Sequence, residues 1–264
     1  MIKNCSLVYF SATKTTKKIV EKIADGINLK NTVHFDITTD LDELNFFNHF
    51  NNQLVIIGVP VNAGRVSPEA AKRLKQLKGN GIPAILVVLY GNRGYDDALI
   101  ELKDIAINQG FKPFAAAAFI GEHSFSNDEY PIAKDRPDYH DLKNAYNFGR
   151  QLQFNIKNNK IQGRTVTVPG NHPYKERQAL PESTPITNEY LCTECEMCIS
   201  VCPTGSIALK DKITTDSTTC ILCFACVKEC SNNARTNESD FVQTIRERTF
   251  NSTLLRREPE LFLN

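Results

Sequence analysis

Eight of the nine cysteines in this 264-residue chain fall into two copies of one spacing. Each copy reads C-x2-C-x2-C-x3-C, the first beginning at Cys192 and the second at Cys220. Cysteines at this spacing are typical ligands of [4Fe–4S] clusters. The spacing therefore predicts two such clusters, with the ligands Cys192, Cys195, Cys198, Cys202, Cys220, Cys223, Cys226 and Cys230.

Two other uses of cysteine fit this pattern poorly. Structural zinc sites usually combine two separate C-x2-C pairs, whereas here four cysteines run together. Disulfides need an oxidising compartment, and nothing in the chain points to one. The clustering of the cysteines instead favours a metal protein of the reducing cytoplasm.

Residues 188–236 resemble the two-cluster ferredoxins of bacteria. In that family the fourth cysteine of each run binds the cluster of the other run. The resemblance implies one cluster on Cys192, Cys195, Cys198 and Cys230, and another on Cys220, Cys223, Cys226 and Cys202. Ser231 stands where the family usually has proline, at a position that shapes a turn and does not bind iron.

Charge and hydropathy exclude several classes of function. The formal net charge is +1, so the totals show no basic footprint for nucleic acid or for a membrane surface. The apolar run at the N-terminus is too short for a signal peptide. No apolar stretch approaches the roughly 20 residues of a spanning helix. We therefore expect a cytoplasmic protein with no nucleic-acid partner and no membrane insertion.

Residues 1–160 alternate two kinds of pattern. Apolar, β-branched runs that suit buried parallel strands occur at 5–10, 33–37, 53–59, 82–90 and 114–120. Helical patterns lie between and after them, at 14–27, 68–78, 95–109 and 138–157. This alternation predicts an α/β fold with a doubly wound parallel sheet of five strands.

Composition divides the chain into four parts. Residues 1–160 form the α/β domain, and 161–187 contain four prolines without periodicity, as expected for a linker or a strap on that domain. Residues 188–236 are the predicted cluster domain, a small α+β unit. Residues 237–264 are predicted as a helix from Phe241 to Phe250 and a tail, whose docking through Leu261 and Phe262 the pattern leaves open.

Hydroxyl residues follow the first predicted strand and lead directly into a helix. Such a loop can bind an anion through backbone N–H groups, hydroxyls and the helix dipole. Neither G-x-G-x-x-G nor the Walker A spacing occurs here, and a helix merely capped by serine or threonine is the alternative. The candidate residues are Ser11, Ala12, Thr13, Lys14, Thr15 and Thr16.

The loops after the third and fourth predicted strands contain small residues, amides and aromatics. Ligands of doubly wound sheets bind at the carboxyl ends of the strands, where these loops lie, and such loops can enclose a flat heterocycle. Ordinary turns are the alternative for each loop taken alone. The candidates are Pro60, Val61, Asn62, Ala63, Gly64, Tyr90, Gly91, Asn92, Arg93, Tyr95 and Asp97.

The N-terminal domain resembles flavodoxin through the S-x-T-x-x-T pattern of Ser11, Thr13 and Thr16. The resemblance implies FMN, with its phosphate on residues 11–16 and its ring between residues 60–64 and 90–95. Flavodoxins usually have glycine where this chain has Lys14, so the lysine either strains the loop or adds a charge for the phosphate. Together the two halves resemble a flavodoxin–ferredoxin fusion family of anaerobes, whose members are electron-transfer proteins.

Other residues offer weaker candidates. His123 follows the fifth predicted strand beside Glu122 and Ser124, and it could donate a proton to a reduced flavin or a substrate. A hydrogen-bonded loop histidine is the alternative. Cys5 is expected to be a core residue.

Flavin and iron–sulfur clusters together indicate an oxidoreductase that transfers electrons. Three functions remain open. The chain could relay electrons between a redox protein or small-molecule partner, the clusters and FMN. It could reduce a small molecule over the flavin, or it could be a non-catalytic redox sensor. A homodimer is also left open.

Overall fold

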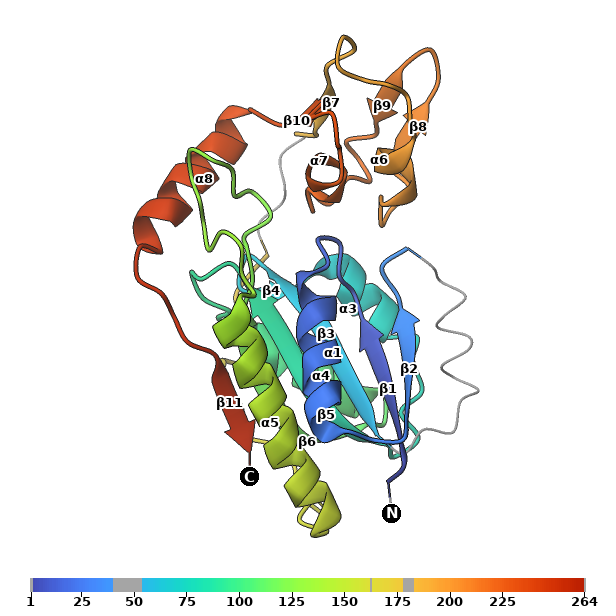
Figure 1. Cartoon of the computed structure of the whole chain (residues 1–264), viewed down its shortest axis with the longest axis vertical. Coiled ribbons are helices and arrows are strands. Elements are labelled where there is room, and N and C mark those ends of the chain that lie inside the picture. The colour runs from blue at the N-terminus through green and yellow to red at the C-terminus, as the bar shows by residue number, and fades with distance from the viewer. Residues whose placement is uncertain (1, 40–53, 162, 178–182, 264) are drawn as a thin grey trace.

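The structure is a computed structural model that describes residues 2–39, 54–161, 163–177 and 183–263. Figure 1 shows a large α/β domain, with the small cysteine-containing domain lying over one end of its sheet. Residue 53 of one predicted strand, residues 162 and 178–182 of the predicted strap, and the terminal residues 1 and 264 lie outside the described ranges.

Five parallel strands form the sheet, which confirms the predicted fold class. Their order is β2-β1-β3-β5-β6, the order of flavodoxin-like folds. Each is buried through most of its length except β2, which lies at an edge. The strands are β1 (Asn4–Tyr9), β2 (Asn31–Asp36), β3 (Val55–Asn62), β5 (Pro83–Tyr90) and β6 (Lys112–Ile120).

Helices cover both faces of this sheet because successive residues of each strand point to opposite faces. Helices α1 (Thr15–Ile27) and α5 (Tyr139–Lys157) pack on one face with Leu7. Helices α3 (Pro68–Leu74) and α4 (Ala98–Asn108) pack on the other face with Val8. The helices agree with the predicted ones within a few residues, except that α3 ends earlier.

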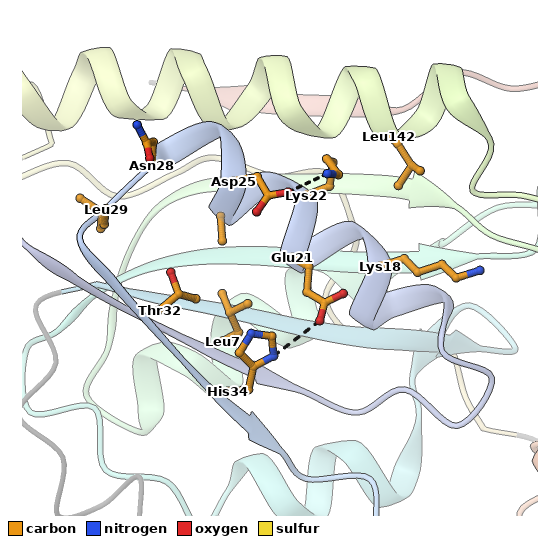
Figure 2. Close-up of a pocket in the computed structure, with 11 residues that line it drawn as sticks. Leu7, Lys18, Glu21, Lys22, Asp25, Asn28, Leu29, Thr32, His34 and Leu142 are labelled. Carbon is orange, nitrogen blue, oxygen red and sulfur yellow. Dashed lines mark hydrogen bonds and ion pairs between the residues drawn. The ribbon is translucent and has the colours of Figure 1, made fainter.

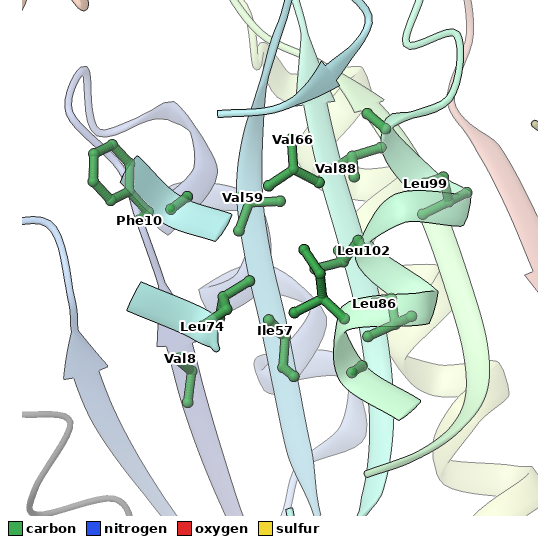
Figure 3. Close-up of a cluster of buried hydrophobic side chains, with 14 of the residues drawn as sticks. Val8, Phe10, Ile57, Val59, Val66, Leu74, Leu86, Val88, Leu99 and Leu102 are labelled. Atoms are coloured by element: carbon green, nitrogen blue, oxygen red, sulfur yellow. The ribbon is translucent and has the colours of Figure 1, made fainter. Parts of the chain in front are cut away.

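A pocket of about 490 Å³ lies where α1 passes over β2 (Figure 2). Figure 3 shows the apolar core on the opposite face, where helix residues meet the strands. The core residues that it labels are Val8, Phe10, Ile57, Val59, Val66, Leu74, Leu86, Val88, Leu99 and Leu102.

Two further strands join the sheet that the sequence did not predict. Strand β4 (Arg65–Val66) forms a hairpin with the end of β3. Strand β11 (Glu260–Leu263) pairs antiparallel with β6, and Phe262 packs against the core. The tail thus extends the sheet at its β6 edge, after helix α8 (Asp240–Ser252) has crossed beside the domain.

Residues 163–177 lie along the α/β domain. Val166 is buried and donates its N–H to the Pro113 carbonyl. Asp97 accepts hydrogen bonds from the N–H groups of Asn171 and Lys175, at 2.8 and 2.7 Å. These contacts hold the segment against the start of α4.

The small domain is built from two similar halves. Helices α6 (Met197–Ser200) and α7 (Ala225–Lys228) are related by the same offset along the chain as the two cysteine runs. Two short antiparallel pairs complete the domain: β7 (Ile186–Thr187) with β10 (Arg235–Thr236), and β8 (Ile207–Leu209) with β9 (Ile213–Thr215). Within the described residues, no helix combines the length and hydropathy needed to cross a membrane.

Candidate functional site

The eight cysteines line two separate cavities in the small domain. Each cavity takes three cysteines from one run and the fourth cysteine from the other run. One cavity is lined by Cys192, Cys195, Cys198 and Cys230. The other is lined by Cys202, Cys220, Cys223 and Cys226. We call them the distal and the proximal cavity, according to their distance from the α/β domain.

The backbone around the cysteines repeats with the same offset as the cysteines themselves. The N–H of Ser206 points to the Cys202 sulfur at 3.3 Å, and the N–H of Ala234 points to the Cys230 sulfur at 3.2 Å. Hydrogen bonds to thiolate sulfur are one means by which proteins set the potential of an iron–sulfur cluster. The loops are therefore shaped for sulfur ligands that carry negative charge.

Burial opposes that charge when no metal is bound. It raises the pKa of Cys223 to about 12, and it also raises the pKa values of Cys220 and Cys226. These groups are neutral thiols at pH 7 and become thiolates when a metal coordinates them. The proximal cysteines therefore suit metal ligation better than nucleophilic chemistry.

Arg235 is buried between the two cavities. It lines the distal cavity, and its Nη2 lies 3.7 Å from the Cys226 sulfur of the proximal one. The guanidinium donates to the hydroxyls of Thr187 and Thr215. Among the described residues, no carboxylate pairs with it, and its Nε has no partner. A buried cation needs a counter-charge, and two anionic clusters would supply one.

Ser11 fixes the loop between β1 and α1 through two hydrogen bonds. Its N–H donates to the Thr38 hydroxyl at 2.8 Å, and its own hydroxyl accepts from the N–H of Lys17 at 3.0 Å. Among the described residues, no acceptor faces the N–H groups of Thr13, Thr15 or Thr16. Free N–H groups at the start of a helix such as α1 are suited to bind an anion.

The side chain of Lys14 points toward the small domain. The residue adopts φ 64°, the left-handed conformation that glycine tolerates and that costs other residues about 1 kcal/mol. Its Nζ pairs with Glu229 of the small domain at 2.7 Å. The strained conformation expected at this position is therefore present, whereas the charge of the lysine faces the small domain and not the loop.

The loops after β3 and β5 pack against each other. Ala63 and Gly64 form the turn of the β3–β4 hairpin, and the Gly64 carbonyl accepts from the N–H of Asp97 at 2.9 Å. A Cβ at Gly91 would lie 2.4 Å from the His123 ring, so glycine lets that ring lie over the loop. Pro60, Val61 and Asn62 are partly exposed at the same edge of the sheet, and Arg93 is exposed.

Three of the predicted side chains, Asn92, Tyr95 and Asp97, form hydrogen bonds outside the predicted site. Asn92 donates to the carbonyls of Thr253 and Leu255, and Tyr95 donates to Glu260 at 2.8 Å. Asp97 holds the 163–177 segment. The rings of Tyr90 and Tyr95 are buried, with their centroids 5.4 Å apart. The hydrogen-bond partners of Asn92, Tyr95 and Asp97 lie far away along the chain, so no local pattern could have indicated them.

His123 lies in the loop after β6, over Gly91. Its Nδ1 accepts from the N–H of Phe125 at 3.1 Å, which places the ring proton on Nε2. Burial and the nearby cations of Arg93 and Lys228 lower the pKa of His123 to about 4. The ring is neutral at pH 7, so it can donate a hydrogen bond but is not an imidazolium acid.

The same loop contacts the small domain beside the proximal cavity. The rings of Phe125 and Phe224 lie 4.5 Å apart, a pair worth about 1 kcal/mol beyond its buried area. Lys228 pairs with Glu122 at 2.6 Å, next to the Lys14–Glu229 pair. The sequence marked Glu122 and Lys14 as loop residues but did not indicate this interface.

Comparisons with known proteins identify a matching family for the small domain. Residues 184–236 match the family described as 4Fe-4S dicluster domain. The search of curated proteins finds no match. Among solved structures, an archaeal flavodoxin is similar at 18% identity, over 58% of this chain and 99% of that one, with a TM-score of 0.42.

Two other solved structures are similar over the same part of the chain. Rubredoxin:oxygen oxidoreductase from the anaerobe Desulfovibrio gigas has 15% identity over 59% of this chain and 36% of its own, with a TM-score of 0.43. Flavodoxin 1 from Bacillus cereus has 13% identity over 59% and 98%, with a TM-score of 0.40. The strand order itself carries the fold assignment. The chain therefore joins an α/β domain of flavodoxin-like topology to a small domain that matches the 4Fe–4S dicluster family.

Proposed function

We propose that the chain is a cytoplasmic iron–sulfur flavoprotein that transfers electrons between an external redox partner, two [4Fe–4S] clusters and FMN. A flavin exchanges one or two electrons whereas a cluster exchanges one, so a flavin and a cluster together connect one-electron donors with two-electron donors. The observation that carries the proposal is the position of the proximal cavity. It faces the carboxyl edge of the sheet, where the Phe125–Phe224 contact and two ion pairs hold the domains together.

The chain's own residues have separable roles toward the cofactors. The two sets of cysteines would hold the clusters, and Arg235 would balance their charge. The free N–H groups and hydroxyls of residues 11–16 would bind the FMN phosphate, with Lys14 tied to the small domain. The ring would lie against residues 60–64, Gly91 and Arg93. Asn92, Tyr95 and Asp97 would not contact the flavin, and would instead position the loops of the site.

His123 is proposed to donate its Nε2 proton as a hydrogen bond toward the ligand edge of the sheet. Its low pKa keeps that donor neutral, so it does not add a positive charge beside the flavin. A positioning role of this kind does not require the histidine to exchange protons during turnover.

Cofactor analysis tests the composition. Protein purified without oxygen is expected to contain about eight iron and eight acid-labile sulfide per chain, together with one FMN. Stoichiometric zinc without visible charge-transfer absorption would contradict the cluster assignment, and FAD in place of FMN would contradict the flavin identity.

A kinetic experiment tests the electron transfer. After rapid photoreduction of the clusters, flavin reduction is expected to be independent of protein concentration. Cys202→Ala should remove the proximal cluster, although residue 202 belongs to the first run, and should slow this step. Cys230→Ala is the matched control, because it should damage the distal cluster. Flavin reduction that is unchanged without either cluster would exclude the internal route.

A further inference from the structure

The two cysteine loops have the same backbone but opposite surroundings. Glu194 and Leu222 are equivalent positions in the two repeats, and both are left-handed, with φ 53° and 51°. Glu196 and Phe224 are also equivalent, with φ 59° and 61°. The glutamates are exposed, whereas Leu222 and Phe224 are only 4% and 2% exposed.

The loop of the second repeat is an interface within the chain. Leu222 and Phe224 pack with Phe125, which lies in the loop after β6. The Lys14–Glu229 and Lys228–Glu122 pairs flank this apolar centre. The loop geometry therefore brings a cysteine cavity close to a neighbouring domain through apolar contact surrounded by ion pairs.

The loop of the first repeat also combines apolar and charged side chains. In the described part of the chain, however, no neighbouring domain packs against it. Tyr190 is 101% exposed, Leu191 47% and Met197 45%, and all three lie beside or at the distal cavity. Exposed apolar groups that gather at one place mark interaction surfaces. Within the described residues, Glu194 and Glu196 form no ion pair, whereas Lys212 pairs with Glu189.

The unpaired charge of this surface is negative. From residue 183 to residue 209 the chain contains three glutamates and no lysine, arginine or aspartate. The net charge of the whole chain is +1, so the negative charge is local. A partner that docks here needs an apolar centre and a cationic rim.

We propose that Tyr190, Leu191, Glu194, Glu196 and Met197, which we call the distal rim, form the docking surface for a redox protein with a cationic rim. One electron would pass between that protein and the cluster held by Cys192, Cys195, Cys198 and Cys230, with no bond made or broken. The inference rests on the proposed function and adds the class of partner. Complexes between redox proteins usually have small interfaces and are transient.

Cytochrome c, a small basic haem protein, serves as the probe. Its reduction by the photoreduced protein is followed without oxygen in a stopped-flow spectrometer. The bimolecular rate is expected to fall as salt rises from about 10 to 200 mM, because salt screens steering between opposite charges. The double variant Glu194→Lys/Glu196→Lys is expected to react about tenfold more slowly at low salt. Tyr190→Ala/Met197→Ala tests the apolar part and should also lower the rate.

Glu129→Lys/Glu176→Lys is the matched control, because it changes the net charge equally at exposed positions outside the rim. It should keep most of the rate. Equal losses in both charge variants, or none in the rim variant, would overturn the inference. A dimer in sedimentation that the rim variant abolishes would also overturn it, because a second copy would then cover the rim. Iron content and concentration-independent flavin reduction are measured on the same samples, so a failure of the proposed function would appear separately.

Discussion

The cluster domain and the α/β domain build their candidate sites in opposite ways. Each cysteine cavity takes three ligands from a single short run, 192–198 or 220–226, and its donors are side chains. The candidate site at the carboxyl edge of the sheet draws on four loops, with residues 11–16, 60–64, Gly91, Arg93 and His123. Its free donors at the start of α1 are backbone N–H groups. The first kind of site is encoded locally, and the second exists only after the sheet has formed.

The difference extends to what stabilises each domain. The α/β domain has two large apolar clusters, one on each face of the sheet. The small domain has only minor clusters, and cysteines account for much of them. Units of about 50 residues with so little core usually need metals or disulfides to fold. We therefore expect the clusters to hold the small domain together, and FMN to be dispensable for folding.

Removal of iron provides the most drastic test of this comparison. Treatment with a chelator and oxidant should unfold residues 184–236 while the α/β domain stays folded, because metal binding there is coupled to folding. Hydrogen exchange would show lost amide protection in the small domain and retained protection in β1, β3 and β5. Removal of FMN alone is the control and should leave both domains protected. Protection that persists in the small domain without iron would break the comparison.

A single charge should weaken the flavin site without affecting the clusters. Thr13→Asp places a carboxylate where the phosphate is proposed to bind, and two like charges repel strongly in a partly buried site. FMN affinity, measured by flavin fluorescence, should fall about tenfold or more, equivalent to about 1.4 kcal/mol. Thr32→Asp, at an exposed threonine on β2, should bind FMN normally. Unchanged affinity in Thr13→Asp would place the phosphate elsewhere.

Arg235 should affect the clusters and leave the flavin site unchanged. Arg235→Leu removes a buried positive charge next to both cavities, so the added electron would be less stabilised. The cluster potentials in a titration followed by electron paramagnetic resonance should fall by about 60 mV, which is tenfold for one electron. Arg235→Lys should recover part of the shift, and Arg150→Leu on the surface should cause none. Potentials that do not change would leave this arginine with a purely structural role.

His123 should have the smallest effect, and it appears in stability. Its pKa in the folded protein is about 4, below the usual 6.5, so the unfolded chain takes up a proton first as the pH falls. Stability should therefore decrease from pH 7 to pH 5. Between pH 7 and pH 5, the Tm of His123→Asn should fall by about 3 °C less than the Tm of the wild-type protein. His140→Asn, at an exposed histidine, should behave as wild type, and an identical pH profile in both variants would contradict the assignment.

Local sequence patterns predicted the strands and the cysteine sites. Strands buried on both faces read as continuous apolar runs, and a cubane takes most of its ligands from one short loop, so neither inference needs distant contacts. The hydroxyl loop at residues 11–16 was visible for the same reason, because a helix N-terminus follows it directly.

Contacts between distant residues decided the remaining features. Strand β11 joins the sheet because the chain after α8 runs back to β6. Hydrogen bonds from Asn92 and Tyr95 fix this segment in place. Lys14 pairs with Glu229, and Phe125 contacts Phe224, only because the small domain lies over the carboxyl edge of the sheet. The amino-acid sequence alone predicted the cofactors that we propose for this protein. The tertiary structure decided which cysteine cavity faces the proposed flavin site, because that depends on packing between segments that lie far apart in the chain.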